Sequence, residues 1–492
     1  MKYKLIGITA TALTLVSVIL ISMFMPEDNG KRYIQHVMAE EKIPCTAHSD
    51  GELCTHLPIV SINTNGVEIP GKPIYDGEEH IVGYSVAEDG TTTIKAGLEV
   101  IDNKDTYNHL SDGNNAIQNI LIRVRGHSSR KFDKPNYFFR FVNTDGTNNP
   151  QEFLGMDSHH EWALHGPYLD KSLIRNYMWY NISGEIMEYS PNVRFFELVL
   201  NGEYRGVYLA LETITSGKEG ARLNLEVNKK DNTFTGYALR LDWGESLDKH
   251  LYPFTNYTLR AKTQHELVSP GTNNATPEIR EAIKDEFSLF EKSLYSYDYN
   301  NKEFGYTNFI DTMSFIDYFL INELTCNYDA GSLSTYIYKD IQGKYKMCVW
   351  DFNSACDFYQ ESAMPSDEFM LNNALWFRML FMDKDFTDKL VDRYYELRET
   401  VFSKEYLFDF IDSTVEYLGY SIDRNYEKWG YTFEKDYDLL YPQERNIRSY
   451  GESVQQIKDF LARRIAFMDE NIESLKQFSA ESKTKKYNEV SD

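Results

Sequence analysis

The stretch 315–358 leaves few options for the fold, because its residue pattern changes twice within a short span. Apolar residues four positions apart, such as Ile316 and Leu320, predict a helix that ends before the polar loop 327–332. Two runs rich in β-branched and aromatic residues follow within 334–350, and turn residues separate them. This order predicts a helix, a loop and then an antiparallel β-hairpin.

Two aspartates flank the predicted hairpin. Asp329 lies in the loop before the first strand, and Asp351 directly follows the second strand. Because the strands of a hairpin are antiparallel, the start of the first lies beside the end of the second, and we expect the two carboxylates to face one region. Phosphoryl transfer needs one carboxylate near the attacking hydroxyl and another that holds magnesium on the phosphates. The spacing therefore predicts a phosphoryl-transfer site.

The rest of the chain separates into a β-rich part and a helical part. Short β-like runs divided by Gly, Asn and Asp turns predict a β-rich region over residues 57–142. Residues 152–188 are expected to be mostly helical, with Asp170 as a cap candidate, and Asn201-Gly202 predicts a tight hairpin. Helical periodicity continues from 367 to 478. These patterns predict an α+β protein.

The N-terminus carries an apolar segment that is long enough to cross a bilayer. Lys2 and Lys4 precede an uncharged run that ends at Met25. Basic residues before such a run favour an anchor with the bulk of the chain outside the cytoplasm, and a cleaved signal peptide is the alternative. We therefore expect residues 1–25 to be a transmembrane anchor or signal peptide and residues 26–56 a linker. The protein is then a single-pass protein of the cell membrane or a secreted one.

The charge of the chain argues against nucleic-acid partners, and its distribution reveals one basic patch. The chain has 51 Lys and Arg against 75 Asp and Glu, a formal net charge of −24, so nucleic-acid binding is not expected. Within this acidic chain a local basic cluster is formed by Arg125, Arg130, Lys131, Lys134 and Arg140, and Gly126 allows close approach of the backbone. Such a cluster can receive phosphates, or it can be a solvated basic loop.

Cysteine usage leaves three readings open near the N-terminus. Cys45 and Cys54 lie close together in a polar segment, which favours a disulfide in an oxidising compartment. His48 and His56 interleave with them, so a zinc site is a second reading, and two unlinked thiols are the third. The remaining cysteines are expected to be buried structural thiols: Cys326, Cys348 and Cys356.

Six segments follow one another in a recognisable order along the chain: LPIVSINTNG, RGHSSRKFDKPNYFFRF, DKSLIRN, LNGEYRGVYLALE, NYDAGSLSTYIYK and VWDFN. This order resembles the spore coat protein H (CotH) kinase family, a family of atypical kinases. The resemblance spans residues 57–478 and implies a protein-kinase-like bilobal fold with a kinase-like core over 143–478. The tail 479–492 is polar and is expected to be disordered.

The resemblance implies metal-dependent transfer of the ATP γ-phosphate to Ser or Thr of a protein substrate, with Mg²⁺ or Mn²⁺. By this likeness Asp329 is the catalytic aspartate and Asp351 the metal aspartate, with Asn353 and Ser334 as further metal ligands. The residues assigned to the nucleotide are Arg125, Lys134, Arg140 and Glu212.

One position departs from the family pattern. The family's Trp-Asp-x-Asp segment has Asn353 in place of its second acid here, and an amide oxygen is a weaker magnesium ligand than a carboxylate. The alternative function is therefore a catalytically weak, kinase-like module for binding or assembly at the cell surface. A glycosidase would need paired acids that flank an aromatic surface, and no such pair stands out.

Overall fold

The structure is a computed structural model that divides the chain into two compact units, Met1–Ile34 and Gln35–Asp492. The predicted anchor, residues 1–25, and residues 481–492 of the predicted tail lie outside the described residues. None of the helices within the described ranges has the length and apolar character that a bilayer crossing needs. The described residues are 32–45, 52–77, 80–113, 116–217, 222–228, 233–244, 249–258, 263–271, 274–434 and 440–480.

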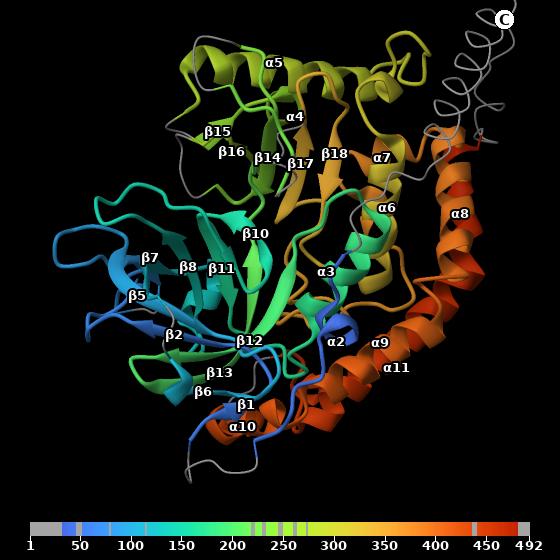
Figure 1. The fold of residues 1–492 in the computed structure, drawn as a ribbon. Helices are drawn as coiled ribbons and strands as arrows, with labels where there is room; N and C mark the ends of the chain where they lie inside the picture. The colour runs from blue at the N-terminus through green and yellow to red at the C-terminus, as the bar shows by residue number, and fades with distance from the viewer. Residues whose placement is uncertain are drawn as a thin grey trace, which may run out of the picture. The chain divides into compact units, whose positions relative to one another are not determined.

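A closed β-barrel forms the first half of the second unit (Figure 1). Its neighbouring strands are antiparallel except for the parallel β2–β12 pair. In β7, buried residues alternate with more exposed ones, so one face of the strand enters the core together with Phe139 and Trp162. Around the barrel the strands are β11 (Glu161–His165), β13 (Glu203–Glu212), β12 (Val193–Leu200), β2 (Ile59–Asn63), β5 (Ile94–Ile101), β7 (Gln118–Arg125) and β8 (Asn136–Phe141).

The barrel corrects two expectations from the sequence. The predicted boundary after residue 142 cuts through it, because β11, β12 and β13 are needed to close it. The helical prediction for 152–188 is wrong before α3 (Arg175–Ile186): β9 (Gln151–Phe153), β10 (Met156–His159) and β11 precede that helix. The residue before α3 is Ile174 rather than Asp170, but Asp170 Oδ2 still accepts the backbone N–H of Arg175 at 2.9 Å.

Part of the predicted linker 26–56 is instead attached to the barrel. Helix α2 (Gln35–Met38) begins with a side chain that exchanges two hydrogen bonds with the backbone of Phe195, at 3.1 and 2.7 Å. Strand β1 (Cys54–Thr55) pairs with β6 (Asn108–His109). Outside the barrel, β3 (Pro73–Tyr75) and β4 (Ile81–Tyr84) form a small hairpin.

A five-stranded antiparallel sheet follows the barrel, in the order β15 (His250–Leu251), β16 (Gln264–Ser269), β14 (Tyr237–Asp242), β17 (Thr335–Lys339) and β18 (Lys346–Cys348). The hairpin predicted within 334–350 is confirmed as β17–β18. The predicted helix before it is α6 (Thr312–Thr325), which packs on β18. Beside the sheet lie α4 (Phe254–Thr258) and α5 (Pro277–Leu294), whose Thr276 cap accepts the N–H of Ile279.

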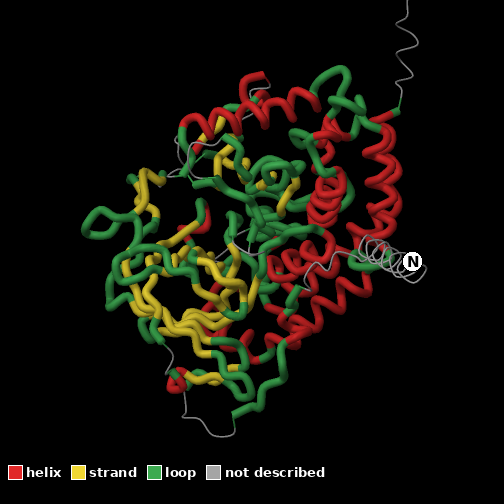
Figure 2. The backbone as a smooth tube through the Cα atoms, turned by 45° about the horizontal axis from the view of Figure 1, so that its top comes forward, coloured by secondary structure: helices red, strands yellow, loops and turns green. Residues whose placement is uncertain are grey.

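The C-terminal part is helical, as predicted, and Figure 2 shows most of the helices on one side of the molecule and the strands on the other. The helices are α7 (Phe377–Leu380), α8 (Lys384–Arg398), α9 (Lys404–Leu418), α10 (Tyr420–Trp429) and α11 (Tyr450–Asn471). Helix α10 packs on β13 of the barrel, and α11 is tied to α6 by a buried ion pair between Arg464 and Glu323 at 2.5 Å. The unit thus has a β-rich N-terminal half and a helical C-terminal half.

Candidate active site

Three carboxylates meet where strands of the second sheet end. Leu241 of β14 pairs with Thr335 of β17, and β17 pairs with β18, so Asp242 and Asp351 leave the sheet at the edge where the Asp329 loop enters it. The pKa of Asp329 is raised to about 7, mainly by burial and in smaller part by the charges of Asp351 and Asp242. The two aspartates that flank the hairpin therefore face one region, and Asp242 joins them.

The loop that carries Asp329 is held by its own backbone. Helix α6 ends at Cys326, which has a left-handed φ of 45°, and the N–H of Asn327 donates to the carbonyl of Asn322 at 3.0 Å. The N–H of Leu333 donates to the carbonyl of Asp329 at 2.7 Å. The N–H of Gly331 donates to the hydroxyl of Thr335 at 2.8 Å. These bonds fix the position from which the Asp329 carboxylate projects.

Asp351 has a strained backbone that its neighbours stabilise. Its φ of 57° lies in the left-handed region, which costs a residue with a side chain on the order of 1 kcal/mol. Its N–H donates to the hydroxyl of Tyr180 at 3.0 Å, from the middle of α3. Burial raises the pKa of the Asp351 carboxyl, the Arg125 guanidinium and Asn353 oppose that rise, and the charge of Asp242 adds to it.

Asn353 supports Asp351 rather than standing apart from it. Its side-chain amide donates to Asp351 Oδ1, and its Oδ1 accepts from the Asn176 amide at 2.7 Å. Asn176 Oδ1 in turn accepts the N–H of Phe352 at 2.9 Å. The predicted role of Asn353 as a metal ligand stays a prediction. What the structure adds is a chain of amides from α3 that orients the carboxylate.

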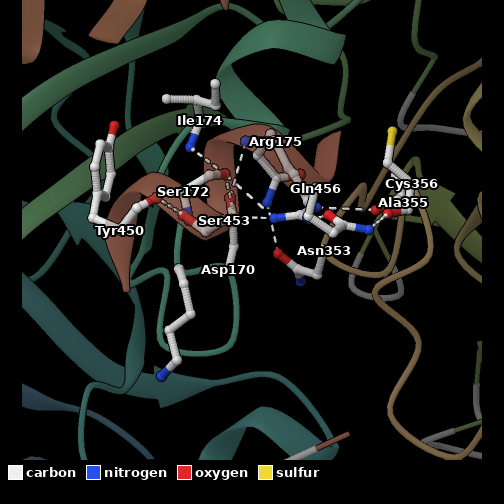
Figure 3. A network of polar contacts seen from close by, with 12 residues as sticks. Asp170, Ser172, Ile174, Arg175, Asn353, Ala355, Cys356, Tyr450, Ser453 and Gln456 are labelled. Carbon is white, nitrogen blue, oxygen red and sulfur yellow. Dashed lines mark hydrogen bonds and ion pairs between the residues drawn. The ribbon is translucent and has the colours of Figure 1, made fainter. Parts of the chain in front are cut away.

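The chain after Asp351 is clamped between α3 and α11 (Figure 3). Arg175, which is fully buried, donates to the carbonyl of Ala355 at 3.0 Å and to Gln456 at 2.6 Å, and it pairs with Asp170. Gln456 donates to the carbonyl of Cys356 at 2.7 Å. Figure 3 shows these residues converging on the segment that follows Asn353. The position of Asp351 therefore depends on helices that are distant in the sequence.

Two buried lysines lie at the end of the barrel. Lys134 Nζ donates to Asn425 Oδ1 at 2.8 Å, and Lys171 Nζ donates to the carbonyl of Tyr168 at 3.2 Å. Burial lowers the pKa of Lys171 to about 7, although Asp170 opposes this. Burial also lowers the pKa of Lys134 well below its usual value, and the neighbouring charge of Lys171 lowers it further. The charged form of each lysine is therefore unfavourable in its buried position.

Arg125 links the carboxylates to the lysines. Its guanidinium lies over the ring of Trp350, 5.4 Å from the centroid, and its charge lowers the pKa of Asp351. The pKa of His165 is lowered to about 3, mainly by burial, and the charges of Arg125 and Lys134 both contribute to this lowering. Arg125, at the end of β7, thus lies near both groups.

The remaining predicted site residues have other neighbours. Arg140 lies opposite Glu161 in the β8–β11 pair, and Glu212 accepts the N–H of Asn192 at 2.9 Å and faces Arg222 at 3.9 Å. Like Lys134, neither is among the charges that shift the pKa of the Asp329 or Asp351 carboxyl. Ser334, with a φ of 46°, directly precedes β17.

Sequence reasoning did not assign four residues: Asp242, Asn176 and Tyr180, which the structure brings to the two flanking aspartates, and Lys171, whose charge acts on Lys134. Three of them had a signal in the sequence. Asp242 ends an apolar strand as Asp351 does, and Lys171 and Asn176 lie in or beside the DKSLIRN segment. Tyr180 had none, because a tyrosine inside a helix is most often a core residue.

Comparison with known proteins gives two matches. The family model described as CotH kinase protein matches residues 122–468, a range that includes both flanking aspartates, Asp242 and the two lysines. The inner spore coat protein H of Bacillus subtilis (strain 168) is 34% identical over 95 residues. That stretch is 19% of this chain and 24% of the relative, so the chain aligns with about a quarter of the relative's length.

Proposed function

The chain belongs to the CotH kinase protein family, and on that basis we propose that it is an atypical protein kinase. In this proposal it transfers the γ-phosphate of ATP to a Ser or Thr hydroxyl of a protein, with Mg²⁺ or Mn²⁺. The observation that supports it is the convergence of Asp329, Asp351 and Asp242 at one sheet edge, with Arg125 beside them.

The donor chemistry fits a divalent cation. Carboxylate oxygens are the ligands that Mg²⁺ prefers, and phosphoryl-transfer sites hold it by one or two carboxylates together with phosphates and waters. Asp351 and Asp242 would hold the ion, and Asn353 would keep Asp351 in position. When bound, the cation offsets negative charge on the phosphates. It would also relieve the repulsion that raises the pKa of Asp329.

The protein's own residues divide the remaining work. Asp329 would accept the proton of the attacking hydroxyl as its oxygen bonds to the γ-phosphorus and the bond to the β-phosphate oxygen breaks, which releases ADP. Lys134 and Lys171 would neutralise the phosphates, since buried cations with a lowered pKa gain most from a nearby anion, and the Arg125 guanidinium would add its charge. Arg140 and Glu212 keep their predicted nucleotide role only if the nucleotide reaches the barrel wall.

A second candidate is a kinase-like module that binds a nucleotide or partner without efficient transfer. Asn353 favours it, because both ends of this amide contact neighbours at the place where the family has a second acid. We also propose, for either function, that the chain acts outside the cytoplasm at a cell or spore surface, with residues 1–25 as its anchor or signal.

Transfer of label from γ-labelled ATP by the full-length chain tests the proposal. We expect incorporation into the chain itself or into an added Ser/Thr-rich acceptor with Mg²⁺ or Mn²⁺, and its loss in Asp351→Ala. Asp367→Asn is the matched control. Asp367 is exposed, follows the hairpin in the sequence as Asp351 does, and is not among the site residues described above. Nucleotide-induced thermal stabilisation without transfer would favour the binding module. If no metal gives either thermal stabilisation by nucleotide or transfer of label, both candidates are contradicted.

A further inference from the structure

A second cluster of metal-ligand types lies away from the three carboxylates, where the N-terminal segment meets the barrel. Cys54 of β1 lies directly opposite His109 of β6. The segment before β1 pairs with the residues directly before β6, since the N–H of Ile43 donates to the carbonyl of Asp105 at 2.8 Å and the N–H of Tyr107 donates to the carbonyl of Ile43 at 3.2 Å. Backbone pairing thus brings Cys45 to the same place.

The ligand atoms of Cys45, Cys54 and His109 all lie within 4.8 Å of one another. No disulfide joins the two cysteines in the structure. We propose that these three residues bind a zinc ion. Zinc bonds of about 2.3 Å to sulfur and about 2.0 Å to nitrogen in a tetrahedron place the ligand atoms roughly 3.5–3.8 Å apart. Small side-chain rotations therefore suffice to form the site.

An acidic residue orients the imidazole as zinc-bound histidines require. His109 Nδ1 lies 3.2 Å from Asp112 Oδ2. Asp112 is itself fixed, because its Oδ2 accepts the N–H of His109 at 2.9 Å and the side-chain amide of Asn103 at 2.7 Å. Since Nδ1 is engaged by the carboxylate, Nε2 is the nitrogen that faces the ion. A carboxylate on the far nitrogen fixes the tautomer and raises the basicity of a metal-bound imidazole.

This arrangement changes the ligand set that the sequence spacing suggested. His56 instead packs its ring against Tyr417 and Tyr107, with centroid distances of 5.0 and 5.9 Å, and it is not part of the group. His48 lies outside the described residues. His109 is far from both cysteines in the sequence and joins them only through the β1–β6 pairing. Three protein ligands leave one position for water or a fourth ligand, and the ion would tie the N-terminal segment to the barrel.

Metal content of the full-length chain tests the site. The chain, purified in reducing buffer without a histidine tag, should contain about one zinc per molecule by elemental analysis. A strong chelator should remove the ion, and added ZnCl₂ should restore it. Cys45→Ser, Cys54→Ser and His109→Gln should each lose most of the zinc. His56→Gln is the matched control and should keep it, because its ring lies outside the group. Circular dichroism of each variant shows whether the fold persists.

Two further measurements keep the test decisive if a ligand variant unfolds. Asp112→Asn leaves the three ligands in place and should weaken zinc binding by about 10–100-fold. Co²⁺ in place of zinc should give a sulfur charge-transfer band and strong tetrahedral ligand-field bands in the wild type, with both reduced in His109→Gln. A Cys45–Cys54 disulfide in peptide maps of the protein from its native compartment would overturn the proposal. So would a reduced chain that takes up no zinc, or zinc that persists in His109→Gln.

Discussion

The pKa of Asp329 beside the hairpin and the pKa values of the two buried lysines at the end of the barrel are shifted in opposite directions by the same cause. Burial is the main cause that raises the pKa of Asp329 and lowers the pKa of Lys171, and both pKa values lie at about 7. Neighbours of like charge add to these shifts, because Asp351 and Asp242 raise the pKa of Asp329 and Lys171 lowers the pKa of Lys134. Each group therefore carries its charge unfavourably when it is alone. The difference shows that the ionised form of Asp329 would be stabilised by a cation, and the charged forms of the two lysines by an anion in addition to Asp170. A metal-bound triphosphate is one ligand that supplies both.

Replacing the proposed base should give the largest effect. Asp329→Asn keeps the size of the side chain but cannot accept a proton, so kcat should fall by about 10²–10⁴-fold. Nucleotide binding should persist, because Asp351 and the lysines are untouched. Label transfer and thermal stabilisation by ATP, measured on the same preparation, separate the two. A variant with wild-type kcat would remove Asp329 from the chemistry and leave only its electrostatic effect on Asp351 and Asp242.

Replacing one of the two buried lysines should give the second-largest effect. Lys134→Met replaces a buried cation by an apolar chain of similar length, and it should weaken ATP binding by about 10–100-fold, since a hydrogen bond to a charged group contributes about 1.5–3 kcal/mol. The nucleotide-free protein should melt at a higher temperature, because the unfavourable buried charge is gone. Lys131→Met, an exposed lysine of the same loop, is the matched control and should change neither quantity. If both variants bind ATP equally well, the basic group is structural.

The pH dependence of stability tests both groups at once. Asp329 has a pKa of about 7 in the folded protein against an ordinary value of 3.8, so between these values the native state holds the extra proton and stability falls as pH rises. Lys171 has about 7 against 10.5, so the unfolded state holds the extra proton and stability rises with pH above 7.

These two groups should therefore contribute least stability near pH 7 in metal-free, nucleotide-free protein. Melting curves between about pH 5 and pH 9 should show that the free energy of unfolding changes by on the order of 1–2 kcal/mol on the acid arm below pH 7 and on the alkaline arm above it. Asp329→Asn should flatten the acid arm and Lys171→Met the alkaline arm, whereas Mg²⁺ with ATP should flatten both. A profile that neither variant changes would show that other groups control the titration.

Local pattern was enough to predict the elements that are continuous in sequence. The hairpin and its two aspartates lie within one stretch, so strand periodicity and turn residues predicted both β17–β18 and the proximity of Asp329 to Asp351. The barrel boundary and Asp242 depend on pairings between distant strands, such as β14 with β17, which no local pattern specifies. The strands within 151–165 were missed because they are short and their alternation is brief.

Asn353 offers the smallest and sharpest change to the acidic group. Asn353→Asp restores the acid of the family pattern but replaces the amide that donates to Asp351, so without metal the two carboxylates repel each other. We expect stability in chelator to fall by on the order of 1 kcal/mol and Mg²⁺ affinity to rise by roughly fivefold, because charge count tunes affinity for hard cations. Thermal shift against Mg²⁺ in the presence of ATP measures both. A rise in transfer rate together with affinity would show that Asn353 limits an active kinase. Tighter metal binding with no transfer would favour the binding module instead.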